Sequence, residues 1–126
     1  MSPLLLSPLA EYVDELIEAD LTGGKLLCAG TKLNPGSWDC ALLAAGTALE
    51  AMEFVLKNEN KVAFALVRPP GHHAQPTMAD GYCFLNNAAL AAQLAVNSGC
   101  RRVAMVDIDV HFGNGSAEVR LVTQRG

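Results

Sequence analysis

The sequence has few positive charges and no cluster of them. Nine Lys and Arg residues stand against thirteen Asp and Glu, which gives a net charge of -4. No run of basic side chains is present that could neutralise a series of phosphates, so we do not expect direct nucleic-acid binding. Long apolar runs are lacking as well, because none approaches the ~20 residues that a membrane span needs. The leucines near Met1 follow no basic segment of the kind that opens a signal peptide, so neither export nor membrane insertion is expected.

The cysteines lack the spacing of a disulfide framework and form no C-x-x-C pair. They stand far apart, at Cys28, Cys40, Cys83 and Cys100. The 51% of hydrophobic residues supply a core without disulfide bonds, in a chain of 126 residues that has room for one small domain. This pattern favours a reducing compartment inside the cell.

Helical patterns account for much of what is present. Apolar residues recur at helical spacing over residues 8–19, with Ser7 as the expected N-cap. Residues 38–56 and 86–97 are rich in Ala and Leu and predict two further helices, with Ser37 as a candidate cap for the first. Between the first two helices, residues 21–37 contain several glycines and a proline, which predicts a loop.

Two short apolar runs predict strands. Residues 62–67 are continuously apolar, as in a strand that is buried on both faces of a parallel sheet, and residues 103–108, apolar apart from Asp107, predict another strand. The order strand, helix, strand makes a β-α-β unit, whose crossover is right-handed in nearly all known cases. We therefore predict an α/β fold in which a parallel sheet is flanked by helices.

Polar clusters follow both predicted strands, at residues 68–75 (RPPGHHAQ) and 107–115 (DIDVHFGNG). Ligands of open parallel sheets bind beyond the carboxyl ends of the strands, so both clusters should lie at one rim. Asp107, Asp109 and His111 alternate and would point to one side of an extended backbone. Asp109 and His111 are a plausible pair of zinc ligands, with Asp107 behind them. The alternative is a solvated turn after a strand.

His72 and His73 stand in tandem at the same predicted rim as His111. Histidine is the side chain best suited to proton transfer near neutral pH, which favours a catalytic role. Loop histidines without a function are the alternative. Tyr82 and Phe84 could line a pocket, although aromatic residues in such positions more often belong to the core.

Three segments together resemble the histone deacetylase family. They are RPPGHHAQP at 68–76, GYCFLNNAALAAQ at 81–93 and VDIDVHFGNGSAE at 106–118, and their order and spacing match successive blocks of that family. The resemblance is closest to the class II and amidohydrolase-like branch. It implies a partial arginase/deacetylase-like fold over residues 1–118, truncated at both ends, and a divergent tail over 119–126.

The resemblance also implies roles for single residues. Asp109 and His111 would bind zinc, and the family's third zinc ligand, a later Asp, would be missing from this chain. His72 and His73 would be the tandem catalytic histidines, one of them the base that acts on zinc-activated water. Asp107 would orient His72.

Gly81 and Tyr82 would form the wall of a channel for the substrate, an acetylated lysine side chain or a small acetylated amine. The family's usual compartment is the nucleus or the cytoplasm. The alternative to a zinc deacetylase is a catalytically inactive fragment, either without function or acting as an interaction module that self-associates through an exposed edge at residues 103–108. An arginase-like manganese enzyme is disfavoured, because Asp-x-Asp-x-His lacks the bridging carboxylates of a two-metal site.

Overall fold

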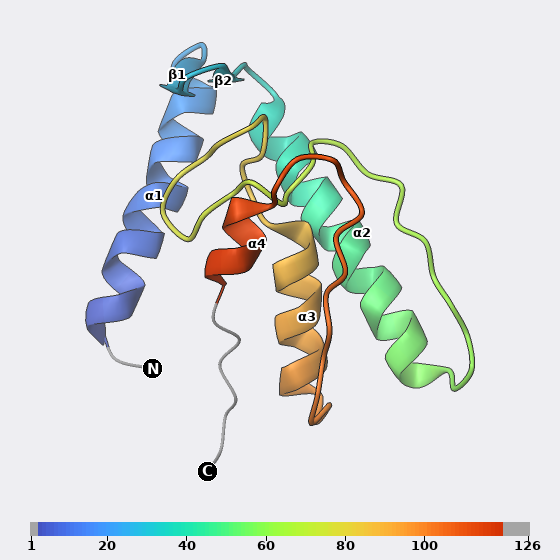
Figure 1. The fold of residues 1–126 in the computed structure, drawn as a ribbon. Helices are drawn as coiled ribbons and strands as arrows, with labels where there is room; N and C mark the ends of the chain where they lie inside the picture. The colour runs from blue at the N-terminus through green and yellow to red at the C-terminus, as the bar shows by residue number, and fades with distance from the viewer. Residues whose placement is uncertain (1–2, 120–126) are drawn as a thin grey trace.

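The fold is mainly helical in the computed structural model, which describes residues 3–119 (Figure 1). Its elements in chain order are α1 (Pro3–Leu21), β1 (Lys25–Cys28), β2 (Thr31–Leu33), α2 (Ser37–Lys57), α3 (Asn87–Asn97) and α4 (Asn114–Glu118). The helices α2 and α3 pack against each other, and α1 contacts α2 and β2. No helix among the described residues is long and apolar enough to cross a membrane.

The helix α1 is amphipathic, as its sequence predicts, but it begins earlier than expected. It starts at Pro3, so Ser7 lies inside the helix and the predicted N-cap is wrong. Proline suits the first turn of a helix, where its missing N–H would have no partner within the helix. Tyr12, Leu16 and Ala19 form the buried stripe of α1 and belong to the main hydrophobic core.

The loop predicted over residues 21–37 contains a short hairpin instead. β1 and β2 pair antiparallel, with Lys25 opposite Leu33. Gly30 in the turn has a φ of 79°, a conformation that glycine adopts without a steric penalty. Thr31 and Leu33 are fully buried on the side that faces the core. The strands are only four and three residues long, so they are too short for alternation to be distinguished from loop composition.

The two Ala-rich helices match their predicted ranges closely. Asn86 caps α3 with its side-chain oxygen, which accepts a hydrogen bond of 3.1 Å from the Ala89 N–H. Ser37 does not cap α2, because it is the first helical residue and Gly36 occupies the N-cap position. The buried alanines of the two helices are Ala41, Ala44, Ala45, Ala89, Ala91, Ala92 and Ala95. Side chains this small permit the close approach of α2 to α3.

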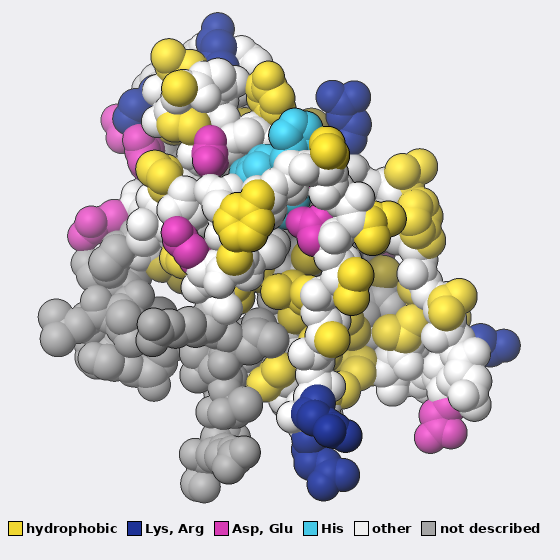
Figure 2. Space-filling model, in the orientation of Figure 1, with side chains coloured by type: hydrophobic (Ala, Val, Ile, Leu, Met, Phe, Trp, Pro, Cys, Tyr) yellow, Lys and Arg dark blue, Asp and Glu magenta, His cyan; other side chains and the backbone are white. Residues whose placement is uncertain are grey.

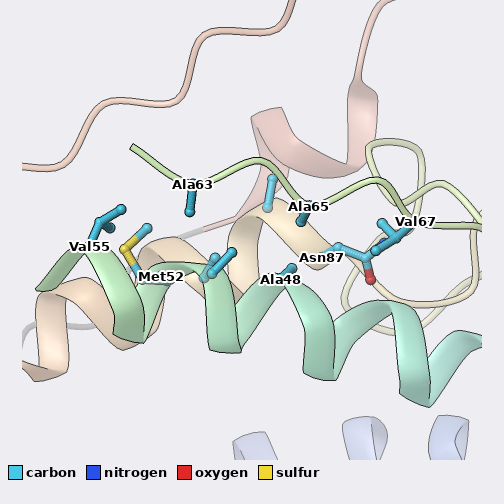
Figure 3. Close-up of a pocket in the computed structure, with 10 residues that line it drawn as sticks. Ala48, Met52, Val55, Ala63, Ala65, Val67 and Asn87 are labelled. Atoms are coloured by element: carbon cyan, nitrogen blue, oxygen red, sulfur yellow. The ribbon is translucent and has the colours of Figure 1, made fainter. Parts of the chain in front are cut away.

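The expected parallel sheet is not formed by residues 3–119, where the hairpin is the only sheet. Residues 62–67 run extended beside α2 and α3 without a strand partner. Ala63, Ala65 and Val67 point toward the helices and line an apolar hollow there, as Figure 3 shows. The alternate side chains face solvent, with Phe64 88% exposed. The helices thus cover one face of this segment, and nothing in residues 3–119 covers the other.

Residues 103–108 likewise form no strand, and most of their apolar side chains are exposed. Val106 and Ile108 are 85% and 95% exposed, whereas the sequence predicts an apolar strand of the parallel sheet there. A strand forms when its backbone groups pair with a neighbouring chain segment, and no such neighbour lies within the described residues. The predicted divergent tail over 119–126 lies outside the described residues apart from Val119.

A buried hydrogen bond joins the first helix to the loop that precedes α3. The Tyr12 hydroxyl donates to the carbonyl oxygen of Phe84 at 2.8 Å. Burial raises the pKa of Tyr12 above its ordinary value, and the charge of Glu15 adds to this effect. The bond connects residues 72 positions apart, so it holds the loop over 79–84 against α1.

We predict that Tyr12→Phe lowers the free energy of unfolding by about 1–3 kcal/mol, because it leaves the buried Phe84 carbonyl without a partner. Urea unfolding monitored by circular dichroism measures the change. Tyr82→Phe removes a hydroxyl from a side chain that is 68% exposed and serves as the matched control, with an expected change within about 0.5 kcal/mol. Equal changes in the two variants would contradict the prediction.

Candidate functional site

The three histidines of the chain lie together where the two extended segments end. The rings of His72 and His73 are 4.0 Å apart between centroids, and those of His73 and His111 are 6.1 Å apart. Figure 2 shows the histidine side chains gathered on one face of the molecule, with acidic and apolar side chains around them. The structure therefore brings the two predicted polar clusters to one place.

His72 is held by a carboxylate. Its Nδ1 lies 2.7 Å from Asp107 Oδ2, while Asp107 Oδ1 accepts a hydrogen bond of 3.0 Å from the Asp109 N–H. The Asp109 N–H, and then the His72 ring, hold the pKa of Asp107 below its ordinary value. An ionised carboxylate can only accept, so Nδ1 of His72 donates and Nε2 is left free to take a proton. The structure thus brings Asp107 into contact with His72, the residue that it is predicted to orient.

His73 is held by an amide. Its Nδ1 lies 2.6 Å from Asn114 Oδ1, and Asn114 Nδ2 donates to Asp80 Oδ2 at 3.3 Å. Neither Asn114 nor Asp80 is among the site residues that the sequence predicts. The only sequence signal for Asn114 is its position between two glycines at the predicted rim, and Asp80 carries no such signal because it lies 34 residues away.

Glycines let the backbone approach both imidazoles closely. A Cβ at Gly113 would lie 2.6 Å from Asp107 Oδ2 and 3.0 Å from His72 Nδ1. A Cβ at Gly81 would overlap the His73 ring, and the φ of Gly81 is 50°. A side chain at Gly113 would therefore force Asp107 or His72 to shift, and one at Gly81 would force the His73 ring to shift. Gly113 is not among the predicted site residues, and Gly81 is predicted on the wall of a substrate channel, whereas the structure places it against the His73 ring.

Tyr82 lies at the edge of this group. Its backbone N–H donates to Thr31 Oγ1 at 3.0 Å, its φ is 65°, and its side chain is 68% exposed. Thr31 itself is fully buried in β2. The hairpin therefore anchors the backbone of the loop that carries Gly81 and Tyr82, while the tyrosine ring remains accessible to a ligand.

The predicted zinc ligands contact each other. Asp109 Oδ1 accepts from the His111 N–H at 2.7 Å and lies 2.8 Å from His111 Nδ1. The His111 N–H, and then its ring, hold the pKa of Asp109 below its ordinary value. The pair supplies two donor types that suit zinc. No group of three or more His, Cys, Asp or Glu side chains arranged for a metal occurs among residues 3–119, so the donor set fits only part of a zinc site.

Comparison with known proteins gives a consistent picture. Residues 6–125 match the family described as histone deacetylase domain. The chain is 62% identical over 120 residues to histone deacetylase 8 of Arabidopsis thaliana. The aligned residues make up 94% of this chain and 32% of that protein. The chain is also 43% identical over 91 residues to the acetylpolyamine amidohydrolase of Mycoplana ramosa. Here the aligned residues make up 72% of this chain and 26% of that protein.

A solved structure is similar as well. The crystal structure of the HDA15 HD domain superposes with a TM-score of 0.83 at 38% identity, covering 89% of this chain and 33% of that chain. The fold of this chain thus matches part of such a domain. The chain spans about a quarter to a third of the length of these three proteins.

We predict that Gly81→Ala disturbs His73, because the added methyl group would overlap its ring. The matched control is Gly30→Ala, where φ is also positive, at 79°, but no atom lies within 4 Å of the added carbon. Both variants carry the backbone cost of positive φ, so we expect Gly81→Ala to lose about 1–3 kcal/mol more than the control. Urea unfolding and the NMR signals of the His73 ring measure the two effects. Equal losses with an unchanged His73 spectrum would contradict the prediction.

Proposed function

The chain belongs to the histone deacetylase family, and from this premise we propose that it carries part of a zinc-dependent amide hydrolysis site. The substrate would be an acetylated lysine side chain of a protein or a small acetylated amine. The names of two relatives, a histone deacetylase and an acetylpolyamine amidohydrolase, correspond to these two substrate classes. A nuclear or cytoplasmic location would fit either substrate.

The observation that carries the proposal is the pair of oriented imidazoles. His72 and His73 each engage an oxygen through Nδ1, at 2.7 Å and 2.6 Å, and this leaves both Nε2 atoms available for proton transfer. We assign the general base and acid to these two histidines, with Asp107 orienting His72 and stabilising its protonated form. Proton transfer by a positioned side chain contributes typically ~10²–10⁴-fold to a rate.

Asp109 and His111 are the proposed zinc ligands of this chain. Bound zinc would lower the pKa of water and polarise the amide carbonyl. A catalytic zinc usually has three protein ligands, and residues 3–119 bring two. The lowered pKa of Asp109 keeps its carboxylate ionised, which is the form that binds a cation.

Gly81 and Tyr82 are the proposed substrate contacts. The exposed Tyr82 ring lies on the loop that abuts His73, so an acyl chain lying along it would reach the imidazoles. Gly81 leaves room at that point, because it places no side chain between the loop and the His73 ring.

We predict that the 126-residue chain binds zinc, and that Asp109→Asn weakens binding by more than about tenfold because it removes the charged donor. Isothermal titration with zinc measures the affinity. Asp39→Asn makes the same chemical change at an exposed carboxylate on α2, so it should leave the affinity unchanged.

Hydrolysis is tested on the same proteins with an acetyl-lysine peptide, with zinc and after chelation. The proposal expects zinc-dependent hydrolysis that falls by ~10²-fold or more in His72→Ala. No hydrolysis under either condition, or hydrolysis that is insensitive to chelation, would count against an enzymatic role for this chain.

The second candidate function is a non-catalytic interaction module. It is favoured by the exposed apolar side chains on both extended segments, where Phe64 and Val106 are 88% and 85% exposed. Unpaired extended segments are templates for pairing with another chain. The partner in this proposal is a second copy of the chain, whose segments carry the same unpaired backbone groups.

We predict that the chain self-associates and that Phe64→Lys and Val106→Lys shift it toward monomer, because charge on an unpaired strand opposes edge pairing. Size-exclusion chromatography with light scattering measures the mass. Leu43→Lys is the control, since Leu43 is 72% exposed but lies on a helix. A monodisperse wild-type monomer that binds zinc would contradict the interaction-module proposal.

A further inference from the structure

We propose that Asp80 is a positioning residue for the tandem histidines: its carboxylate orients the Asn114 amide, and the amide fixes His73 in its Nδ1–H tautomer. Three side chains from separate parts of the sequence are joined in this order by hydrogen bonds of 3.3 Å and 2.6 Å. The value of this tautomer for catalysis rests on the proposed function. The tautomer itself does not, since it follows from the contacts alone.

The Asp80 carboxylate is firmly placed. Its Oδ1 accepts from the Gly81 N–H at 2.8 Å and from the Cys28 thiol at 3.6 Å. Its backbone pairs with that of Cys83 in both directions, at 2.7 Å and 3.2 Å. Because Oδ1 is engaged in this way, Oδ2 is the oxygen that faces Asn114.

The direction of the amide follows from what each group can do. A carboxylate has lone pairs but no hydrogen to donate, so the group that faces Asp80 must be the NH₂ of Asn114. The Asn114 carbonyl oxygen then faces His73, and it can only accept. The hydrogen must therefore sit on Nδ1 of His73, which leaves Nε2 as the free acceptor.

His72 and His73 differ in how the hydrogen is fixed on Nδ1. Asp107 orients His72 directly, because a carboxylate offers no donor in any orientation. Asn114 alone could present either its oxygen or its NH₂ to His73, since an amide can turn over. A second acceptor, on the other side of the Asn114 amide from His73, is needed to fix the oxygen rather than the NH₂ toward His73. The Asp80 carboxylate is that acceptor.

The test reads the tautomer of His73 directly in the 126-residue chain. A long-range ¹H–¹⁵N NMR spectrum, recorded at about pH 8, distinguishes a protonated Nδ1 from a protonated Nε2. We expect the Nδ1–H form in the wild type. Asp80→Asn should lose the single tautomer, with Nε2–H signals appearing, because the new amide can donate as well as accept. The control Asp14→Asn changes an exposed carboxylate on α1 and should leave His73 unaltered.

The exchanged pair, Asp80→Asn with Asn114→Asp, is the rescue control for the route through residue 114. Its aspartate at position 114 accepts from both neighbours, so the Nδ1–H form of His73 should return. A wild-type His73 in the Nε2–H form overturns the proposal, as does an Asp80→Asn spectrum identical to that of the wild type. If Asp80→Asn does not fold, Asp80→Ala decides, because it removes the acceptor altogether: a mixture of His73 tautomers supports the proposal and the wild-type spectrum overturns it. None of these readouts requires hydrolysis, so failure of the proposed function would leave the result unaffected.

Discussion

Two hydrogen bonds to imidazole Nδ1 atoms hold the candidate site together, one from His72 to Asp107 and one from His73 to Asn114. Each bond joins the loop after the first extended segment to a residue near or beyond the end of the second, since Asp107 lies close to the end of that segment and Asn114 begins α4. Few other side-chain contacts join these two parts; one is the bond of 3.1 Å between Asn86 and Ser116. The geometry of the site therefore depends on these contacts across the rim rather than on a sheet beneath it.

Much of the helical structure could be predicted from sequence, because helices are specified by local periodicity. The ranges of α2 and α3 follow from patterns within a few residues. The start of α1 could not be placed, because Pro3 and Pro8 both suit a first helical position. The two extended segments were recognised as apolar runs, but burial on both faces is a property of neighbouring elements and not of the run itself.

In the candidate site, too, local patterns could be predicted from sequence and contacts between distant residues could not. Alternation within residues 107–111 and the tandem histidines were visible in the sequence, and the structure places them together. The contact of Asn114 with Asp80 spans 34 residues and depends on how two loops meet, so no local pattern could indicate it. The chain matches about a third of the HDA15 HD domain. The two extended segments expose apolar faces that no other element among the described residues covers.

The glycines beside the histidines have a thermodynamic consequence. Backbone at Gly81 and Gly113 lies so close to the two rings that the imidazoles have little room to change rotamer. The conformational entropy of these side chains is therefore lost when the chain folds, and binding of a ligand removes little more. A site that is already ordered can hold its reacting groups at a fixed separation throughout a reaction.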